Sequence, residues 1–132
     1  MKRFVFSILT LLGLSGTAIA ADFGPLVTPD ELHALIGQAD APLVLDIRGD
    51  DYAKGHIEGA VSAPYGLFRG PAQNPGELVV QDQLQDTLRN LGVTLDQPVV
   101  VVHQGADDND FGAAARVYWT LKSSGVSHLA IL

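Results

Sequence analysis

Apolar residues with helical spacing mark three segments of this chain. Residues three or four positions apart lie on one face of a helix, and this spacing predicts helices over residues 28–37 and 82–90, with a third from about Phe111 to Ser124. The first begins clearly, because Thr28-Pro29-Asp30-Glu31 supplies a capping threonine, a proline for the first helical position and the glutamate of a capping box. Leu32, Leu35 and Ile36 form its apolar stripe. Glycines are expected to end the three helices, at Gly37, Gly92 and Gly125.

Continuous apolar runs alternate with these helices and predict strands. The runs are Leu43–Ile47, Ala60–Ala63, Val99–Val102 and Leu129–Leu132. Four consecutive valines after Pro98 are typical of a central parallel strand that is covered on both faces. The order of elements therefore predicts an α/β fold with a mostly parallel central sheet and helices on both faces. Residues 64–80, rich in proline and glycine, are expected to be a long surface connection.

The last predicted strand ends with the final residue, Leu132. In an α/β fold, a helix normally follows such a strand and covers one face of the sheet. We therefore expect the fold to be truncated at its C-terminal end and the sequence to be a fragment of a longer chain. An apolar patch at residues 129–132 would then be left in water, so the fragment would be marginally stable or would associate through that face.

The first twenty residues have the pattern of a cleavable signal peptide. Lys2 and Arg3 precede an apolar run from Phe4 to Leu14, and Ala18-Ile19-Ala20 fits a cleavage site. A membrane anchor is the less favoured interpretation, because the run is shorter than the roughly 20 residues that cross a bilayer. Without a cysteine near the cleavage site, lipoprotein anchoring is excluded. The expected location is periplasmic or secreted.

Charge and composition narrow the function of the remaining 112 residues, which suffice for one domain. The formal net charge of −7 becomes −9 when Lys2 and Arg3 are removed. Such an acidic chain repels phosphate, so we expect no nucleic-acid partner and, after signal cleavage, no membrane partner. The sequence contains no cysteine. It therefore has neither disulfide bonds nor a thiol nucleophile.

One motif is specific enough to suggest a family. Asp46-Ile47-Arg48 closes a predicted strand, and Tyr52-Ala53-Lys54-Gly55-His56-Ile57-Glu58-Gly59-Ala60 follows it. The aspartate can accept hydrogen bonds at the strand end, while Gly55 and Gly59 permit tight turns around His56. Together these residues closely resemble the rhodanese (sulfurtransferase) family. The resemblance extends over residues 26–132. The resemblance implies that Asp46, Arg48, Gly55, His56 and Gly59 form a structural motif that holds the fold and does not touch substrate.

A second stretch extends the resemblance and bears on catalysis. In catalytic rhodaneses a cysteine follows the valine-rich strand, and the backbone N–H groups of its loop surround the persulfide. Here His103 occupies that position. The stretch from His103 through Ala115-Arg116-Val117-Tyr118-Trp119 looks most like the inactive N-terminal half of two-domain thiosulfate or 3-mercaptopyruvate sulfurtransferases. We expect Trp119 to lie in the core or at a domain interface.

The resemblance also implies the partners of the parent enzyme. A second rhodanese domain, missing here, would carry the cysteine persulfide and transfer sulfane sulfur from a small anionic donor, with no metal or organic cofactor. The family is one of sulfurtransferases, but this chain lacks the catalytic cysteine and should be inactive in sulfur transfer by itself. The alternative is a stand-alone, non-catalytic binding or regulatory module. The reading frame beyond Leu132 would separate the two hypotheses.

The residues after the valine strand allow other interpretations. His103 could be a nucleophile or general base, but no companion group is identifiable from the sequence, which favours a polar residue at a strand end. The same loop carries three acidic residues, Asp107, Asp108 and Asp110, whose charge would repel an anionic donor. The simpler interpretation is that they favour the N-terminus of the next helix, with Asn109 or Asp110 as its cap. A calcium loop is disfavoured, because Phe111 stands where an oxygen ligand is required. We therefore expect no metal site.

Overall fold

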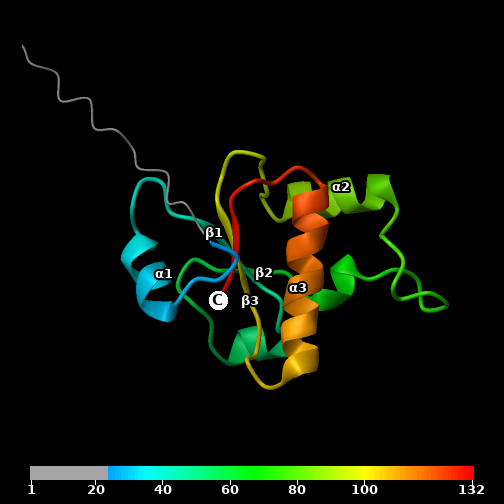
Figure 1. The fold of residues 1–132 in the computed structure, drawn as a ribbon, viewed down its shortest axis with the longest axis horizontal. Coiled ribbons are helices and arrows are strands. Elements are labelled where there is room, and N and C mark those ends of the chain that lie inside the picture. Colours follow the sequence, from blue (N-terminus) through cyan, green and yellow to red (C-terminus); the bar gives the residue numbers. More distant parts are fainter. Residues whose placement is uncertain (1–23) are drawn as a thin grey trace, which may run out of the picture.

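The structure, a computed structural model, describes residues 24–132, so the predicted signal peptide lies outside the described residues. Helices and strands alternate along this range (Figure 1). The helices are α1 (Pro29–Leu35), α2 (Gln81–Asn90) and α3 (Asp108–Ser123), and two short 3-10 helices are η1 (Gly49–Lys54) and η2 (Tyr65–Phe68). The strands are β1 (Leu43–Asp46), β2 (Val61–Ser62), β3 (Val99–Val102) and β4 (Leu129–Ile131).

The strands form one parallel sheet in the order β2-β1-β3-β4. In its register, Asp46 of β1 lies opposite Val102 of β3 and Ser62 of β2. Each connection between parallel strands must cross the sheet, and helices make those crossings. The expected fold class, a parallel α/β sheet covered by helices, is confirmed.

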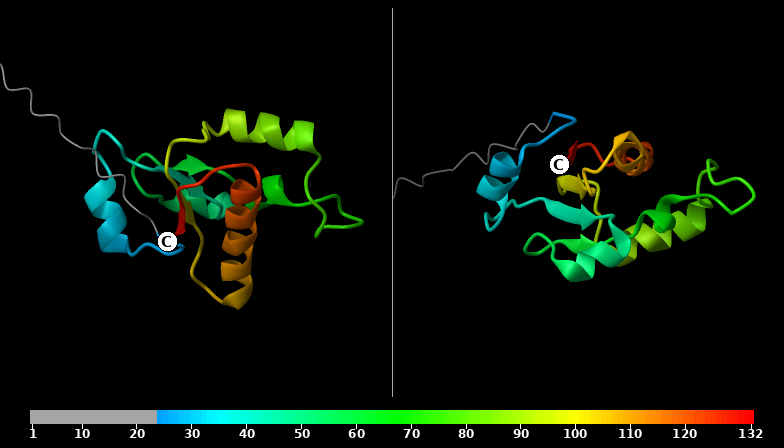
Figure 2. Two further views of the ribbon diagram at one scale, coloured as in Figure 1. Left: turned by 45° about the horizontal axis from the view of Figure 1, so that its top comes forward. Right: turned by 90° about the horizontal axis from the view of Figure 1, so that it is seen from below.

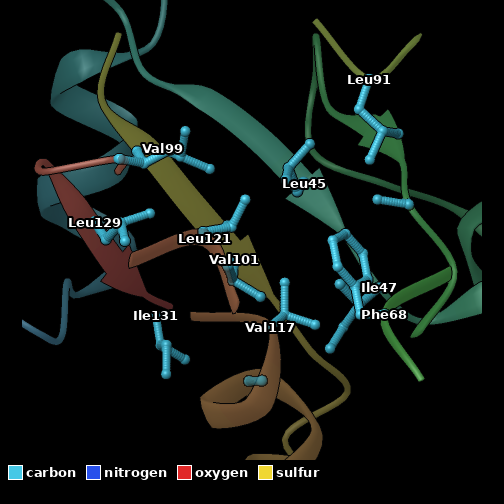
Figure 3. Close-up of a cluster of buried hydrophobic side chains, with 13 residues drawn as sticks. Leu45, Ile47, Phe68, Leu91, Val99, Val101, Val117, Leu121, Leu129 and Ile131 are labelled. Atoms are coloured by element: carbon cyan, nitrogen blue, oxygen red, sulfur yellow. The ribbon is translucent and has the colours of Figure 1, made fainter. Parts of the chain in front are cut away.

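The four valines of β3 occupy the centre of the sheet, and all are buried. Successive strand residues point to opposite faces. Val99 and Val101 therefore pack with Val117 and Leu121 of α3, as Figure 3 shows. Their neighbours Val100 and Val102 belong to a second cluster on the other face, with Leu32 of α1. Figure 2 shows α1 on one side of the sheet and α2 and α3 on the other.

The start of α1 agrees with the prediction in detail. The Thr28 hydroxyl accepts a hydrogen bond from the Glu31 N–H, and the Glu31 carboxylate accepts one from the Thr28 N–H, which completes the capping box. These hydrogen bonds lower the pKa of Glu31, the bond from the Thr28 N–H most. The helix buries Leu32 fully, whereas Leu35 and Ile36 are half-buried.

Several predicted boundaries were wrong. Helix α3 begins at Asp108, three residues before the predicted start, and its cap is Asp107 rather than Asn109 or Asp110. Residues 64–80 are not wholly a surface connection, because they include η2, whose Phe68 is fully buried beneath α3. A proline- and glycine-rich composition conceals such a buried aromatic residue, since the 3-10 turn that carries it is too short to show periodicity.

The expected apolar patch at the last strand was also wrong. Leu129, Ala130 and Ile131 are at most 5% exposed. Leu129 and Ile131 pack in the cluster that contains α3, and Ala130 packs in the cluster that contains α1. The outer edge of β4 is also paired, because the Val27 N–H donates to the Ile131 carbonyl at 2.9 Å. Residues 25–27 thus cover an edge that the sequence pattern leaves open.

Candidate functional site

Two polar groups lie at the carboxyl ends of neighbouring strands. β1 ends at Asp46 and β3 ends one residue before His103. Because these parallel strands pair in register, with Asp46 opposite Val102, both groups lie at the same end of the sheet. Ligands of open α/β sheets bind at this end, so it is the candidate functional site.

At the end of β1, Arg48 donates hydrogen bonds to the Asp46 carboxylate from both its side chain and its backbone. Arg48 Nε lies 3.0 Å from Oδ1 and its terminal nitrogen 2.6 Å from Oδ2. The Arg48 backbone N–H donates to Oδ1 at 3.0 Å. Asp46 is fully buried, and the bonds to it raise the pKa of Arg48. A buried, bidentate ion pair of this kind has its hydrogen-bonding capacity largely used within the chain.

The same guanidinium fastens the segment that follows. Arg48 donates to the Gly55 carbonyl at 2.7 Å, and the Tyr52 hydroxyl donates to the Ala60 carbonyl at 2.8 Å. The His56 ring stacks on Tyr52, with ring centroids 3.8 Å apart. Gly55 has φ 152° and so adopts a backbone conformation that disfavours other residues. These contacts tie the end of β1 to the segment from Tyr52 to Ala60.

At the end of β3, the structure places a carboxylate beside His103. Nδ1 lies 2.9 Å from Oδ2 of Asp110. We assign the ring proton to Nδ1, because its nearest partner is a carboxylate. The side chains are 10% and 22% exposed, respectively, and the Phe111 ring packs edge-on against the imidazole. The companion group that the sequence did not reveal is therefore Asp110, seven residues away.

Asp110 also accepts hydrogen bonds from the loop between β3 and α3. The Gln104 N–H donates to Oδ1 at 3.3 Å and the Ala106 N–H to Oδ2 at 3.0 Å. Burial raises the pKa of Asp110, but the bonds from His103, Ala106, Gln104 and Gly105 together outweigh it and hold the pKa below its ordinary value. The Gly105 N–H also lies 3.2 Å from Nδ1. The same N–H contributes least among these groups to the lowered pKa of Asp110.

The pair is oriented like a general base with its supporting carboxylate. Nε2 of His103 makes no hydrogen bond with residues 24–132. It is not among the fully buried side-chain atoms that lack a partner there, so it is at least partly accessible to solvent. An imidazole held in this way can accept a proton at Nε2. It cannot form a persulfide, because that bond requires a thiolate sulfur. Among residues 24–132, no three histidine or acidic side chains are grouped to hold a metal ion.

Sequence reasoning missed the role of Arg116 and left two places open for Trp119, the core or a domain interface. Arg116 donates to the carbonyl groups of Gly76 and Glu77, at 2.9 and 2.7 Å, and so fastens the 70–77 turn to α3. Trp119 is 48% exposed, so it is not a core residue of this domain, and its place at a domain interface stays a prediction. Its ring lies against the Arg116 guanidinium, 5.4 Å from centroid to carbon. No local signal predicts a contact between residues 40 positions apart.

Comparison with protein families gives a match to the rhodanese-like domain over residues 28–132. The chain belongs to the rhodanese family. This match covers most of the sequence and agrees with the parallel sheet and with the motif at Asp46 and Arg48. As a member of that family, the chain has His103 directly after the central strand and no cysteine at any of its 132 positions.

Individual relatives of this rhodanese-like chain are longer proteins. It is 31% identical over 121 residues to SseB of Mycobacterium tuberculosis, whose name gives thiosulfate sulfurtransferase as a provisional activity; the match covers 81% of this chain and 40% of SseB. A protein of Synechococcus elongatus with the same provisional activity is 34% identical, covering 67% of this chain and 28% of the relative.

A solved structure gives the same result for the fold. SseA of Escherichia coli, described as a 3-mercaptopyruvate sulfotransferase with the rhodanese fold, superimposes with a TM-score of 0.53 at 26% identity. The match covers 68% of this chain and 32% of SseA. The chain thus spans less than half the length of these relatives. In residues 24–132, no helix is both long and apolar enough to cross a membrane.

Proposed function

We propose that this chain is the non-catalytic rhodanese-like domain of an exported two-domain sulfurtransferase. The observation that carries the proposal is the loop after β3, where a histidine paired with Asp110 replaces the thiol that sulfur transfer needs. The domain would support a second rhodanese domain and would not transfer sulfur itself. That second domain would take sulfane sulfur from a small anionic donor such as thiosulfate and hold it as a cysteine persulfide.

The length of the relatives supports the second domain. The chain corresponds to 40% of SseB and 32% of SseA, which leaves room in each for a further domain of similar size. If the reading frame continues beyond Leu132, a rhodanese-like segment with a cysteine loop is expected there. An immediate stop codon would instead favour the stand-alone binding or regulatory module.

Export is the second part of the proposal. Its support is the positive, apolar and small-residue pattern of residues 1–20. We expect the full chain, expressed in a bacterium, to appear in the periplasm or medium with Ala21 as its first residue. Intact-mass measurement of the purified protein checks this. A cytoplasmic product that retains Met1 would contradict it.

The absence of activity is tested with thiosulfate and cyanide. We expect the purified chain to form thiocyanate no faster than buffer, because no residue can carry the persulfide. Thiocyanate formation above that rate would overturn the proposed function.

A His103→Cys variant tests the loop further. We expect little activity from it, because Asp110 and the neighbouring acidic residues raise the pKa of the new thiol and repel the anionic donor. Rates typical of the family in this variant would show that the acidic loop is no obstacle.

A further inference from the structure

The loop between β3 and α3 directs two backbone N–H groups to one carboxylate. The N–H groups of Gln104 and Ala106 both point to the Asp110 carboxylate, and that of Gly105 also lowers its pKa. Gly105 has φ 72°, the left-handed conformation that lets consecutive N–H groups converge. Converging N–H groups of this kind form a concave site for an anion, wherever the anion comes from.

In this chain the anion at that point is the protein's own. Oδ1 of Asp110 accepts from Gln104, whereas Oδ2 accepts from Ala106 and lies 2.9 Å from His103 Nδ1. Both carboxylate oxygens are therefore engaged. An external oxyanion would need the same N–H groups and would meet the charge of Asp110 at contact distance.

We propose that Asp110 is an internal ligand that closes the 103–110 loop to external anions, an autoinhibitory contact built into the fold. The contact depends on Asp110 in particular and not on the general acidity of the loop. Asp107 has a different task, because its side chain accepts from the Asp110 N–H at 2.9 Å and caps α3. The Asp108 side chain is exposed and makes no hydrogen bond with residues 24–132. This arrangement does not depend on a second domain.

The chain offers a matched pair of variants for the test. Asp110→Ala and Asp108→Ala each remove one negative charge from the same helix turn. Only the first leaves the N–H groups of Gln104 and Ala106 without their acceptor. Binding of inorganic sulfate and of thiosulfate to the purified chain and to both variants can be measured at constant ionic strength. Calorimetry gives the affinity, and the amide shifts of Gln104 and Ala106 in NMR spectra locate the site.

The Asp110→Ala variant should bind both anions at least about tenfold more tightly than the Asp108→Ala variant, since one charge-assisted hydrogen bond is worth about that factor. The shifts of Gln104 and Ala106 should move in the Asp110→Ala variant alone. Equal affinities for the two variants, or tight binding by the unaltered chain at these amides, would overturn the proposal.

A second pair covers the case in which Asp110→Ala does not fold. Asp110→Asn keeps an acceptor oxygen and the shape of the side chain while removing its charge, and Asp108→Asn is its control. We expect Asp110→Asn to bind sulfate more tightly than Asp108→Asn, by less than the alanine variant gains. No difference between the two folded asparagine variants would contradict the autoinhibitory role.

Discussion

The two carboxylates of the site, Asp46 and Asp110, differ in their burial and in the groups that hold them. At the end of β1, Asp46 is fully buried and its partner is the guanidinium of Arg48, a side chain two residues away. Beyond the end of β3, Asp110 lies in the first turn of α3 and is partly exposed, and its partners are the His103 ring and the N–H groups of a loop. The first carboxylate is thus held mainly by a side-chain cation, and the second by a histidine together with backbone N–H groups.

We expect this difference to separate a structural contact from a functional one. The pair at β1 ties the strand to the 49–60 segment through the Gly55 carbonyl, so its loss should affect the whole fold. The carboxylate at β3 fills a loop that would otherwise present free N–H groups, so its loss should change what the loop binds.

Replacing Arg48 with alanine should have the largest effect. Asp46 would remain buried without its cation, and breaking a buried pair in this way costs about 3–5 kcal/mol in the free energy of unfolding. Urea denaturation followed by circular dichroism measures the loss. Arg89→Ala is the control, because it breaks an exposed pair with Asp86 (3.5 Å) and should cost less than about 1 kcal/mol. Similar losses of unfolding free energy in the two variants would show that the Asp46–Arg48 pair does not stabilise the fold more than an exposed ion pair does.

Replacing Asp110 with asparagine should have an intermediate, pH-dependent effect on stability. The pKa of Asp110 in the folded chain lies below its ordinary value of 3.8. Its contribution to stability is therefore fully present above that value and is lost as the pH falls through the folded pKa. The melting temperature of the variant should lie below that of the unaltered chain near pH 6, and the gap should close in acid.

The Asp108→Asn variant is the control for this pH dependence, because the Asp108 side chain has no comparable hydrogen bonds to lose. A gap that stayed constant from pH 6 to the acid range would show that the Asp110 charge contributes nothing to folding. An equal gap in Asp108→Asn would assign the effect to net charge rather than to the loop.

Replacing Tyr52 with phenylalanine should have the smallest effect. The variant loses the bond to the Ala60 carbonyl, worth about 1 kcal/mol, but keeps the ring that stacks on His56. Tyr118→Phe is the control, since the Tyr118 hydroxyl makes no hydrogen bond with residues 24–132 and its ring contact to Lys122 survives. Chemical denaturation of both variants would detect the difference. A loss as large as that of Arg48→Ala would mean that the 49–60 segment depends on Tyr52 more than on the guanidinium.

The sequence by itself determined the features that depend on near neighbours. The unbroken run of four valines predicted their central place in the sheet, because every residue of a strand covered on both faces must be apolar. The capping box of Thr28 and Glu31 was predictable because its partners are three residues apart. The motif around Asp46 and Arg48 and the absence of cysteine were readable in the same way, and they led to the family and to the expectation of an inactive domain.

Only the tertiary structure decided the features that join distant or irregular segments. Asp110 meets His103 across a loop in which Gly105 takes a positive φ, and no residue pattern predicts where a loop directs its N–H groups. The last strand is buried because residues 25–27 and both helical layers reach it from elsewhere in the chain. Local sequence encodes propensity and spacing, whereas burial and electrostatic partners depend on which segments the fold brings together.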